Sequence, residues 1–299
     1  MLLKRIVRRS KRAGRELADI PLRRRLSISP RSGRTLAPLA DPAQNSTLVV
    51  TAHPDDESIA AAALMQQVPR LGVICVTNGA PLKESYARQA GFDNWIDYAS
   101  KRRQEIEAAL GCLNREVAPL HCLGISDQEA VSHLVGVTRH LVKQLNGFQQ
   151  AITHAYEGGH PDHDSTAFCV HAACALIQRS GGVPPAIIES PLYSAPDGRY
   201  VHQVFVPHAD AGPVLSVPLS EEQKILKRRM YACHETQSKT FNDFHVETEQ
   251  FRIAPRYHFS APPHPGDVGY NQFRWPLTGK VWRRLAWKAM RELDLLELA

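Results

Sequence analysis

Long apolar runs are missing from this sequence. No stretch of eighteen or more apolar residues occurs among its 299 residues, and the N-terminal letters MLLKRIVRRSKRAGREL interrupt every apolar pair with Arg or Lys. A membrane-spanning helix needs about 20 apolar residues and a secretory signal needs an apolar centre, so the sequence predicts neither. We therefore expect a cytoplasmic protein.

Paired cysteine motifs are missing as well. None of the six cysteines belongs to a CxxC motif, and most of them stand within apolar stretches: Cys75, Cys112, Cys122, Cys169, Cys174 and Cys233. This usage predicts reduced, buried thiols rather than disulfides or a cysteine-ligated zinc. The remaining composition, 43% hydrophobic and 22% charged, is that of an ordinary globular protein with one large core or two modest domains.

Acidic residues are scarce only at the start of the chain. Residues 1–34 hold twelve Lys or Arg against Glu16 and Asp19, a balance of +10, whereas the whole chain carries +6, so the rest sums to −4. Such an arm attracts anionic lipid headgroups or nucleic acid by roughly a kilocalorie per mole for each cation near the surface. A solvated terminus and an organelle presequence are the alternatives. A peripheral place at a membrane therefore stays open.

The body alternates short β-branched runs with longer helical patterns, which predicts a Rossmann-like α/β fold. Strands that alternate with helices form a mostly parallel sheet with helices on both faces. The expected strands are 46–52, 71–79, 118–125, 150–156 and 186–193, and the expected helices are 57–68, 98–113, 131–148 and 165–180.

The last hundred residues depart from this alternation. Residues 200–220 predict a small β-ribbon, and residues 220–237 predict a helix that opens with Ser220 and Gln223 as a capping box. Pro and Gly are frequent in 254–279, and 281–299 has the pattern of an amphipathic helix. We expect this helix to pack on the body; the alternative is a helix lying on a membrane.

Two polar clusters follow expected strands and precede expected helices. They are HPDDE at 53–57 and YEGGHPDHD at 156–164, and both contain His-Pro-Asp. Helix capping by Asp56, Glu57 or Asp164 explains acids at such places. Capping does not explain the histidines, because histidine is a poor cap. Imidazoles beside carboxylates in a polar turn indicate a divalent metal site.

A catalytic zinc needs three protein ligands and an open position. His53, Asp56 and His163 meet that number, and prolines in both turns restrict the backbone that carries them. Asp55 is left over as a carboxylate that can take a proton from water. His160 can hydrogen-bond an oxyanion or protonate a leaving amine.

The fragments AHPDDE and YEGGHPDHD, in this order and about a hundred residues apart, resemble the LmbE or PIG-L family of zinc-dependent N-deacetylases. The resemblance covers roughly residues 46–240. It implies hydrolysis of the acetamide of an N-acetylated amino sugar or glycoconjugate to a free amine and acetate. It also implies that His53, Asp56 and His163 hold Zn²⁺ or another divalent ion, that Asp55 is the general base and that His160 stabilises the tetrahedral intermediate.

This resemblance divides the chain into three parts. We expect a basic arm at 1–40, an LmbE/PIG-L-like deacetylase domain at 41–250, and a Pro-rich segment with an amphipathic helix at 251–299. The implied substrate is a small-molecule or lipid-linked amino sugar, and no specific nucleic-acid partner is expected.

Further polar residues are candidates for the site. Asn78 and Asp127 stand in turns on the same sheet edge, where they bind sugar hydroxyls or merely cap turns. His234 and Gln237 lie in a segment that resembles one lining the family's binding site, with a solvated helix end as the alternative. Glu157 is expected to orient a ligand histidine. The histidines within expected strands and helices, His121, His133, His140 and His171, are interpreted as structural or surface residues.

Two other functions stay open at this point. Two histidines and one carboxylate also hold iron(II) in oxygenases. A polyanion- or membrane-binding protein, built around the basic arm with a degenerate deacetylase core, is the other. The full set of His53, Asp55, Asp56, His160 and His163 speaks against degeneracy.

Overall fold

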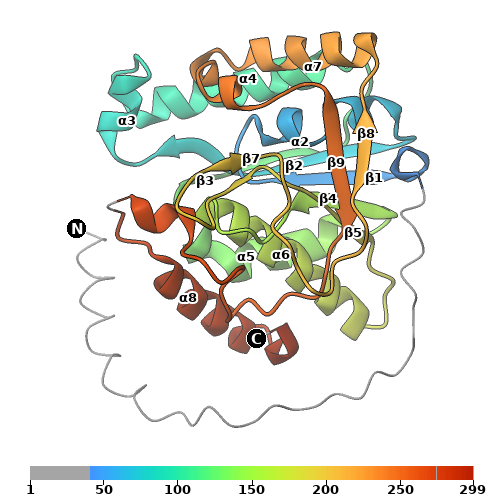
Figure 1. Cartoon of the computed structure of the whole chain (residues 1–299), viewed down its shortest axis with the longest axis vertical. Helices are drawn as coiled ribbons and strands as arrows, with labels where there is room; N and C mark the ends of the chain where they lie inside the picture. Colours follow the sequence, from blue (N-terminus) through green and yellow to red (C-terminus); the bar gives the residue numbers. More distant parts are fainter. Residues whose placement is uncertain (1–40, 274, 299) are drawn as a thin grey trace. The chain divides into compact units, whose positions relative to one another are not determined.

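A mixed sheet forms the centre of the computed structural model, which describes residues 41–273 and 275–298. Within these residues the sheet has seven strands in the order β3-β2-β1-β4-β5-β9-β8 (Figure 1). The first five run parallel: β1 (Thr47–Thr51), β2 (Leu71–Pro81), β3 (Leu120–Asp127), β4 (Gln150–His154) and β5 (Ala186–Ser190). The last two, β9 (Thr248–Ile253) and β8 (Leu215–Pro218), are antiparallel additions.

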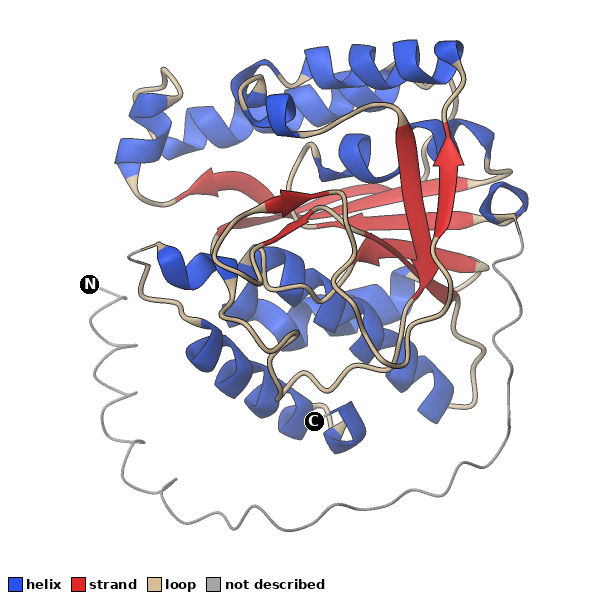
Figure 2. Ribbon diagram, viewed as in Figure 1, coloured by secondary structure: helices blue, strands red, loops and turns tan. Residues whose placement is uncertain are grey.

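Helices cover both faces of the sheet (Figure 2). One face carries α2 (Asp56–Gln67), α4 (Trp95–Gly111) and α7 (Glu221–Cys233), and the other carries α5 (Leu134–Gln144), α6 (Pro161–Arg179) and α8 (Gly279–Glu292). The short helix α3 (Glu84–Gln89) follows β2. The observed layers confirm the Rossmann-like α/β architecture expected from the sequence.

The side chains of β1 show how one strand serves two cores. Leu48 and Val50 belong to the cluster that includes Phe168 of α6, whereas Val49 belongs to the cluster that includes Met65 of α2. Successive side chains of a strand point to opposite faces, so a strand covered on both sides must be apolar throughout. All five residues of β1 are buried.

The C-terminal third corrects the expected β-ribbon at 200–220. Instead, β7 (Val201–His202) pairs with β6 (Tyr193–Ser194), and β8 joins the main sheet through β9. Strand β9 lies across the boundary expected at residue 250. The capping box of Ser220 and Gln223 is present at the start of α7.

The amphipathic helix expected at 281–299 is α8, and it packs on the body. Trp282 is fully buried in the same core as α5 and α6, and its Nε1 donates to Ser165 Oγ at 2.9 Å. Among residues 41–273 and 275–298, no helix is long and apolar enough to cross a bilayer. The basic arm at 1–34 lies outside the described residues.

All six cysteines are free thiols, as expected. Cys75, Cys169 and Cys174 are buried, while the other three are partly exposed, so the prediction of burial holds for half of them.

The buried ion pair of Lys227 and Glu249 supplies hydrogen-bond partners at an irregular turn of α2. Ala61 leaves the helical conformation (φ −152°, ψ 27°), which frees backbone groups around it. The Glu249 carboxylate accepts hydrogen bonds from the amides of Ala63 (2.9 Å) and Leu64 (3.2 Å). Lys227 Nζ donates to the carbonyl of Ile59 (2.8 Å) and to Glu249 Oε1 (3.2 Å). This pair fixes the first turn of α2, which begins at Asp56.

Candidate metal centre and active site

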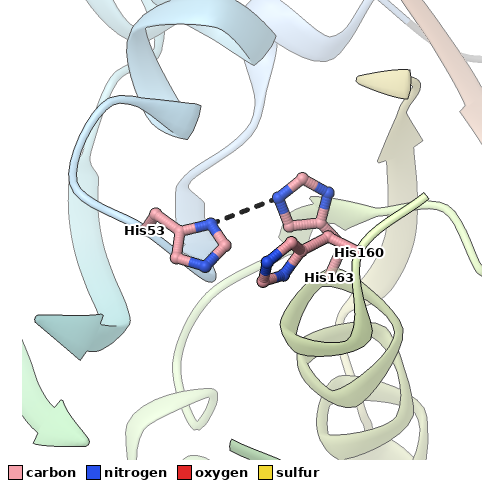
Figure 3. A group of neighbouring side chains, drawn as sticks. All are labelled: His53, His160 and His163. Carbon is pink, nitrogen blue, oxygen red and sulfur yellow. Dashed lines mark hydrogen bonds between the residues drawn. The ribbon is translucent and has the colours of Figure 1, made fainter. Parts of the chain in front are cut away.

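The two polar clusters meet at the carboxyl ends of neighbouring strands. β1 and β4 are paired in parallel, so the turns that follow them lie at the same sheet edge. The β1–α2 turn supplies His53 and Asp55, and Asp56 begins α2. His160 is the N-cap residue of α6, and His163 lies in the first turn of that helix. Figure 3 shows the three histidines facing one another, with a contact between His53 and His163.

The donor atoms of His53, Asp56 and His163 lie close to one another, and Asp56 reaches the two histidines with different carboxylate oxygens. His53 Nδ1 lies 3.3 Å from His163 Nε2 and 3.3 Å from Asp56 Oδ2. His163 Nε2 lies 3.5 Å from Asp56 Oδ1. Ligands about 2.0 to 2.2 Å from a tetrahedral ion stand about 3.3 to 3.6 Å apart. The three side chains therefore stand close enough to hold one divalent ion, with one or both Asp56 oxygens as ligands.

The protonation states of the two histidines also suit a cation between these side chains. His53 Nε2 faces Asp127 Oδ1 and Asp162 Oδ2, each at 3.3 Å, so a neutral His53 keeps its proton on Nε2 and a lone pair on Nδ1. Burial by itself would lower the pKa of His53, but the carboxylates around it, first Asp56, raise that pKa well above 6.5. The same negative field attracts a cation. Burial lowers the pKa of His163 to about 3, which keeps it neutral.

His154, a residue that the sequence analysis left out, stands close to the same atoms. Its Nε2 lies 3.3 Å from Asp56 Oδ2, and Asp56, His154 and His163 form one of three groups of described side chains that could hold a metal ion. The other two groups are His53, His160 and His163, and His53, Asp127, His160 and Asp162. However, His154 Nε2 already accepts a hydrogen bond from the amide of Ala52 at 2.8 Å. The His154 ring is stacked on the His163 ring, with centroids 4.1 Å apart. We infer that His154 positions His163 rather than a metal.

Asp55 occupies a strained backbone position beside the donors. It is the N-cap residue of α2, with φ at 137°, a conformation that non-glycine residues rarely adopt. Its carboxylate lies 3.3 Å from Arg102 Nη2 of α4, and both side chains are buried. Burial and the neighbouring Asp56 raise the pKa of Asp55 to about 7, against the pull of Arg102. A carboxylate with a near-neutral pKa suits a general base.

His160 corrects the statement that capping cannot explain the histidines. It is the N-cap of α6, and its Nδ1 accepts a hydrogen bond from the amide of Asp162 at 3.2 Å. Since Nδ1 accepts, a neutral His160 carries its proton on Nε2, which lies 3.7 Å from Asp127 Oδ1. Burial lowers the pKa of His160 well below 6.5. His160 is therefore a neutral donor aimed at the site.

Asp162 is a buried part of the site that the sequence analysis missed. Its carboxylate accepts hydrogen bonds from the amides of Gln128 (2.6 Å) and Ala130 (3.1 Å), and it faces His53 Nε2. The sequence signal was its place between His160 and His163, in the first turn of α6. Asp127, a candidate for binding sugar hydroxyls or capping a turn, shares the Nε2 side of His53 with Asp162, and its contact with a sugar remains a prediction.

Asn78 and Glu157 make local backbone contacts. Asn78 Oδ1 accepts from the amide of Ala80 at 2.9 Å, which agrees with the turn-capping interpretation. Glu157 was expected to orient a ligand histidine. Its Oε1 accepts instead from the amides of Leu192 (3.0 Å) and Tyr193 (3.1 Å), because the chain after β5 passes beside it. Glu157 thus supports the loop that carries Tyr193.

His234 and Gln237 also have structural partners. His234 is fully buried, and its Nε2 lies 3.3 Å from Glu57 Oε1 and 3.3 Å from Ser58 Oγ. It therefore holds the first turn of α2, which corrects the alternative of a solvated helix end. Gln237 Nε2 donates to the hydroxyl of Tyr98 at 2.8 Å. Direct contact of either residue with a substrate remains a prediction.

The fold and the donor set define the class: an α/β protein with a site for one divalent metal ion at the strand ends. Comparison with known families then gives the particular group. The model for PIG-L, described as GlcNAc-PI de-N-acetylase, matches residues 48–174, a segment that contains both polar clusters. Residues 48–174 of the chain are therefore similar to the PIG-L family.

Solved structures share this fold at low sequence identity. The zinc-inhibited form of teicoplanin deacetylase Orf2 is 17% identical, with a TM-score of 0.52, over 69% of this chain and 97% of its own. The A40926 pseudoaglycone deacetylase Dbv21 is 16% identical, with a TM-score of 0.55, over 70% of this chain and 96% of its own. No curated protein sequence matches the chain significantly. These likenesses show a common fold.

Proposed function

We propose that this protein is a zinc-dependent N-deacetylase of an N-acetylated amino sugar or glycoconjugate. The observation that carries the proposal is the group of His53, Asp56 and His163, whose nitrogen and carboxylate atoms lie 3.3 to 3.5 Å from one another, in a segment that matches the PIG-L family. The fold shared with teicoplanin deacetylase Orf2 and the A40926 pseudoaglycone deacetylase Dbv21 is consistent with a deacetylase.

The three donors would hold the metal ion, and their neighbours keep them in place. Asp162 and Asp127 face His53, and His154 stacks on His163. Nitrogen and carboxylate donors suit zinc, although similar sites accept other divalent ions. Once bound, the ion would polarise the amide carbonyl and acidify water.

Two side chains would then move protons and stabilise charge. Asp55, with a pKa raised to about 7, accepts a proton from the attacking water and returns it to the departing amine. Arg102 holds its carboxylate at 3.3 Å. His160 offers its Nε2 proton to the oxygen that gains negative charge when the amide carbon becomes tetrahedral. The helix N-terminus that His160 caps fixes the imidazole for this task.

An iron(II) oxygenase is the alternative function, because two histidines and one carboxylate can also hold iron(II). The family match favours hydrolysis. Hydrolysis proceeds without oxygen, so activity under nitrogen separates the two functions. The polyanion- or membrane-binding alternative depends on the arm at residues 1–34, which lies outside the described residues. On that alternative, removal of the arm abolishes anion binding; on the proposed function, it leaves turnover of a water-soluble substrate largely intact.

The test is deacetylation of a panel of N-acetylglucosaminides by the chelated protein, before and after the return of one equivalent of zinc. We expect no amine release after chelation and recovery with zinc, both in air and under nitrogen. His53→Ala should lose zinc and activity, while His121→Ala should keep both, because the His121 ring contacts His140 instead. Tight zinc binding without amine release from any N-acetyl substrate would contradict the proposed reaction.

A further inference from the structure

Aromatic side chains continue outward from two histidines of the site. The His163 ring lies 4.9 Å from the Tyr193 ring, and the His160 ring lies 5.5 Å from the Trp275 ring. Further contacts join Tyr193 to Tyr200 (5.8 Å), Tyr200 to Phe273 (6.3 Å), and Phe273 to Trp275 (4.7 Å). Since His160 and His163 are 5.4 Å apart, the six rings form a closed circuit. We call Tyr200, Phe273 and Trp275 the aromatic wall.

The aromatic wall is built by segments outside the family match, which ends at residue 174. Tyr200 precedes β7, and Phe273 and Trp275 belong to the Pro-rich segment before α8. This segment is attached to α3, because Trp275 Nε1 donates to the hydroxyl of Tyr86 at 3.3 Å. The Tyr200 hydroxyl donates to the carbonyl of Gly159, next to His160, at 3.5 Å.

Close packing also ties the wall to the helix η5 (Gly269–Gln272), which precedes Phe273. A β-carbon on Gly269 would stand 2.7 Å from the Tyr200 hydroxyl. Because Gly269 has no side chain, the Tyr200 ring can pack directly against the backbone of η5. This close packing holds Tyr200 in a defined position in the wall.

The exposure of the rings in this circuit increases with distance from the candidate metal donors. His163 is fully buried, Tyr193 and Trp275 are partly buried, and Phe273 is 45% exposed. The wall residues carry no charge. The methyl group of an acetamide is bonded to the reacting carbon and must stay near the donors. A group attached to the sugar lies several bonds further away, where the exposed aromatic faces are.

We infer that the aromatic wall binds an apolar, preferably aromatic, group attached to the N-acetylated sugar. The substrate is then a glycoconjugate with such an aglycone rather than a free monosaccharide. This inference rests on the proposed function and deepens it. Aromatic rings pack on one another with offset or edgewise geometry at centroid distances of about 4.5 to 7 Å, which is the spacing within the wall itself.

The experiment compares two simple probes with the zinc-loaded full chain. These are phenyl and methyl N-acetyl-β-glucosaminide, and the measured quantity is the ratio of their kcat/KM values. We expect a preference for the phenyl substrate of about 10-fold, and a fall of that ratio by about 3- to 10-fold in Trp275→Ala and in Phe273→Ala. Most of the change should appear in KM.

Trp287→Ala is the matched control, a partly buried tryptophan of α8 that lies against Arg291. It should keep the wild-type ratio. Equal losses on both substrates in the wall variants would mean a structural role and overturn the inference. An unchanged ratio would do the same, as would a wild-type enzyme without preference. If the wall variants change only the preference between N-acetyl and longer N-acyl chains, the wall contacts the acyl group. That result would also overturn the inference.

Failure of the proposed function gives a different result. In that case neither substrate releases amine under any metal condition. If only this inference fails, both substrates are turned over, and the ratio of their kcat/KM values is the same in the wild type and in the wall variants.

Discussion

Removal of the Lys227 ammonium should destabilise the protein, because this group hydrogen-bonds α2 next to its irregular turn at Ala61. In Lys227→Met the carbonyl of Ile59 loses a donor at 2.8 Å, and Glu249 loses its cationic partner at 3.2 Å. The side chains of Lys227 and Glu249 are 0% and 1% exposed, so water cannot replace either partner.

The magnitude follows from that burial. Removing one partner of a buried ion pair costs about 3 to 5 kcal/mol, because it leaves an uncompensated charge. Part of the charge on Glu249 stays stabilised, since the amides of Ala63 and Leu64 still donate to it. We therefore expect a loss near the lower limit, about 3 kcal/mol in the free energy of unfolding, or a fall in Tm of about 10 °C for a domain of this size.

The assay is urea unfolding of the chelated protein, so that metal binding does not contribute to the free energy. Lys227→Met/Glu249→Gln is the matched comparison, because it removes the unpaired charge while the amide oxygen can still accept a backbone hydrogen bond. The double variant should be more stable than Lys227→Met by at least about 1 kcal/mol. A loss below about 1 kcal/mol in Lys227→Met would refute the reasoning, as would a double variant that is less stable than the single one.

Three further predictions concern the site and one buried histidine. Asp55→Asn should retain zinc in a binding titration and lose about 10²- to 10⁴-fold in kcat; metal release with full activity per bound ion would reverse the roles of base and ligand. Asp162→Ala should weaken zinc binding by about 10- to 100-fold, because His53 and two backbone amides lose their acceptor, and unchanged affinity in a competition with a chelating dye would contradict this. Burial lowers the pKa of His171 to about 4, below its unfolded value, so its contribution to stability is complete above about pH 6.5 and is lost as the pH falls toward 4. Between about pH 7 and pH 5 the wild type should therefore lose about 2 kcal/mol more than His171→Phe in urea unfolding, and parallel pH profiles would show that His171 does not titrate in this way.

The part of the site nearest in sequence was predictable. His53, Asp55 and Asp56 stand in one short turn, and His160 and His163 in another, and both turns follow apolar strands. Parallel strands bring such turns to one edge, so the meeting of the two clusters followed from the pattern. The positions of Asp162 and His154 did not, because acids and histidines at strand and helix ends have common structural uses.

The C-terminal third shows where pattern reasoning failed. β9 is only six residues long and lies next to a Pro-rich stretch, so periodicity could not separate it from a loop. Its pairing with β5 and β8 depends on partners about 30 to 65 residues away, which local sequence does not specify. The aromatic residues of 254–279 likewise have no periodic pattern that would assign them to the site.

The sequence by itself determined the layers of the fold and the residue types of the candidate metal donors, because both depend on residue types at short spacing. Only the tertiary structure decided which groups stand around those donors. Lys227 and Glu249 meet at a helix break, Glu157 supports the loop of Tyr193, and Trp275 comes to lie beside His160 more than a hundred residues from it. Such contacts arise from packing over the whole core, where each partner is chosen by space and by unsatisfied hydrogen bonds rather than by its neighbours in the chain.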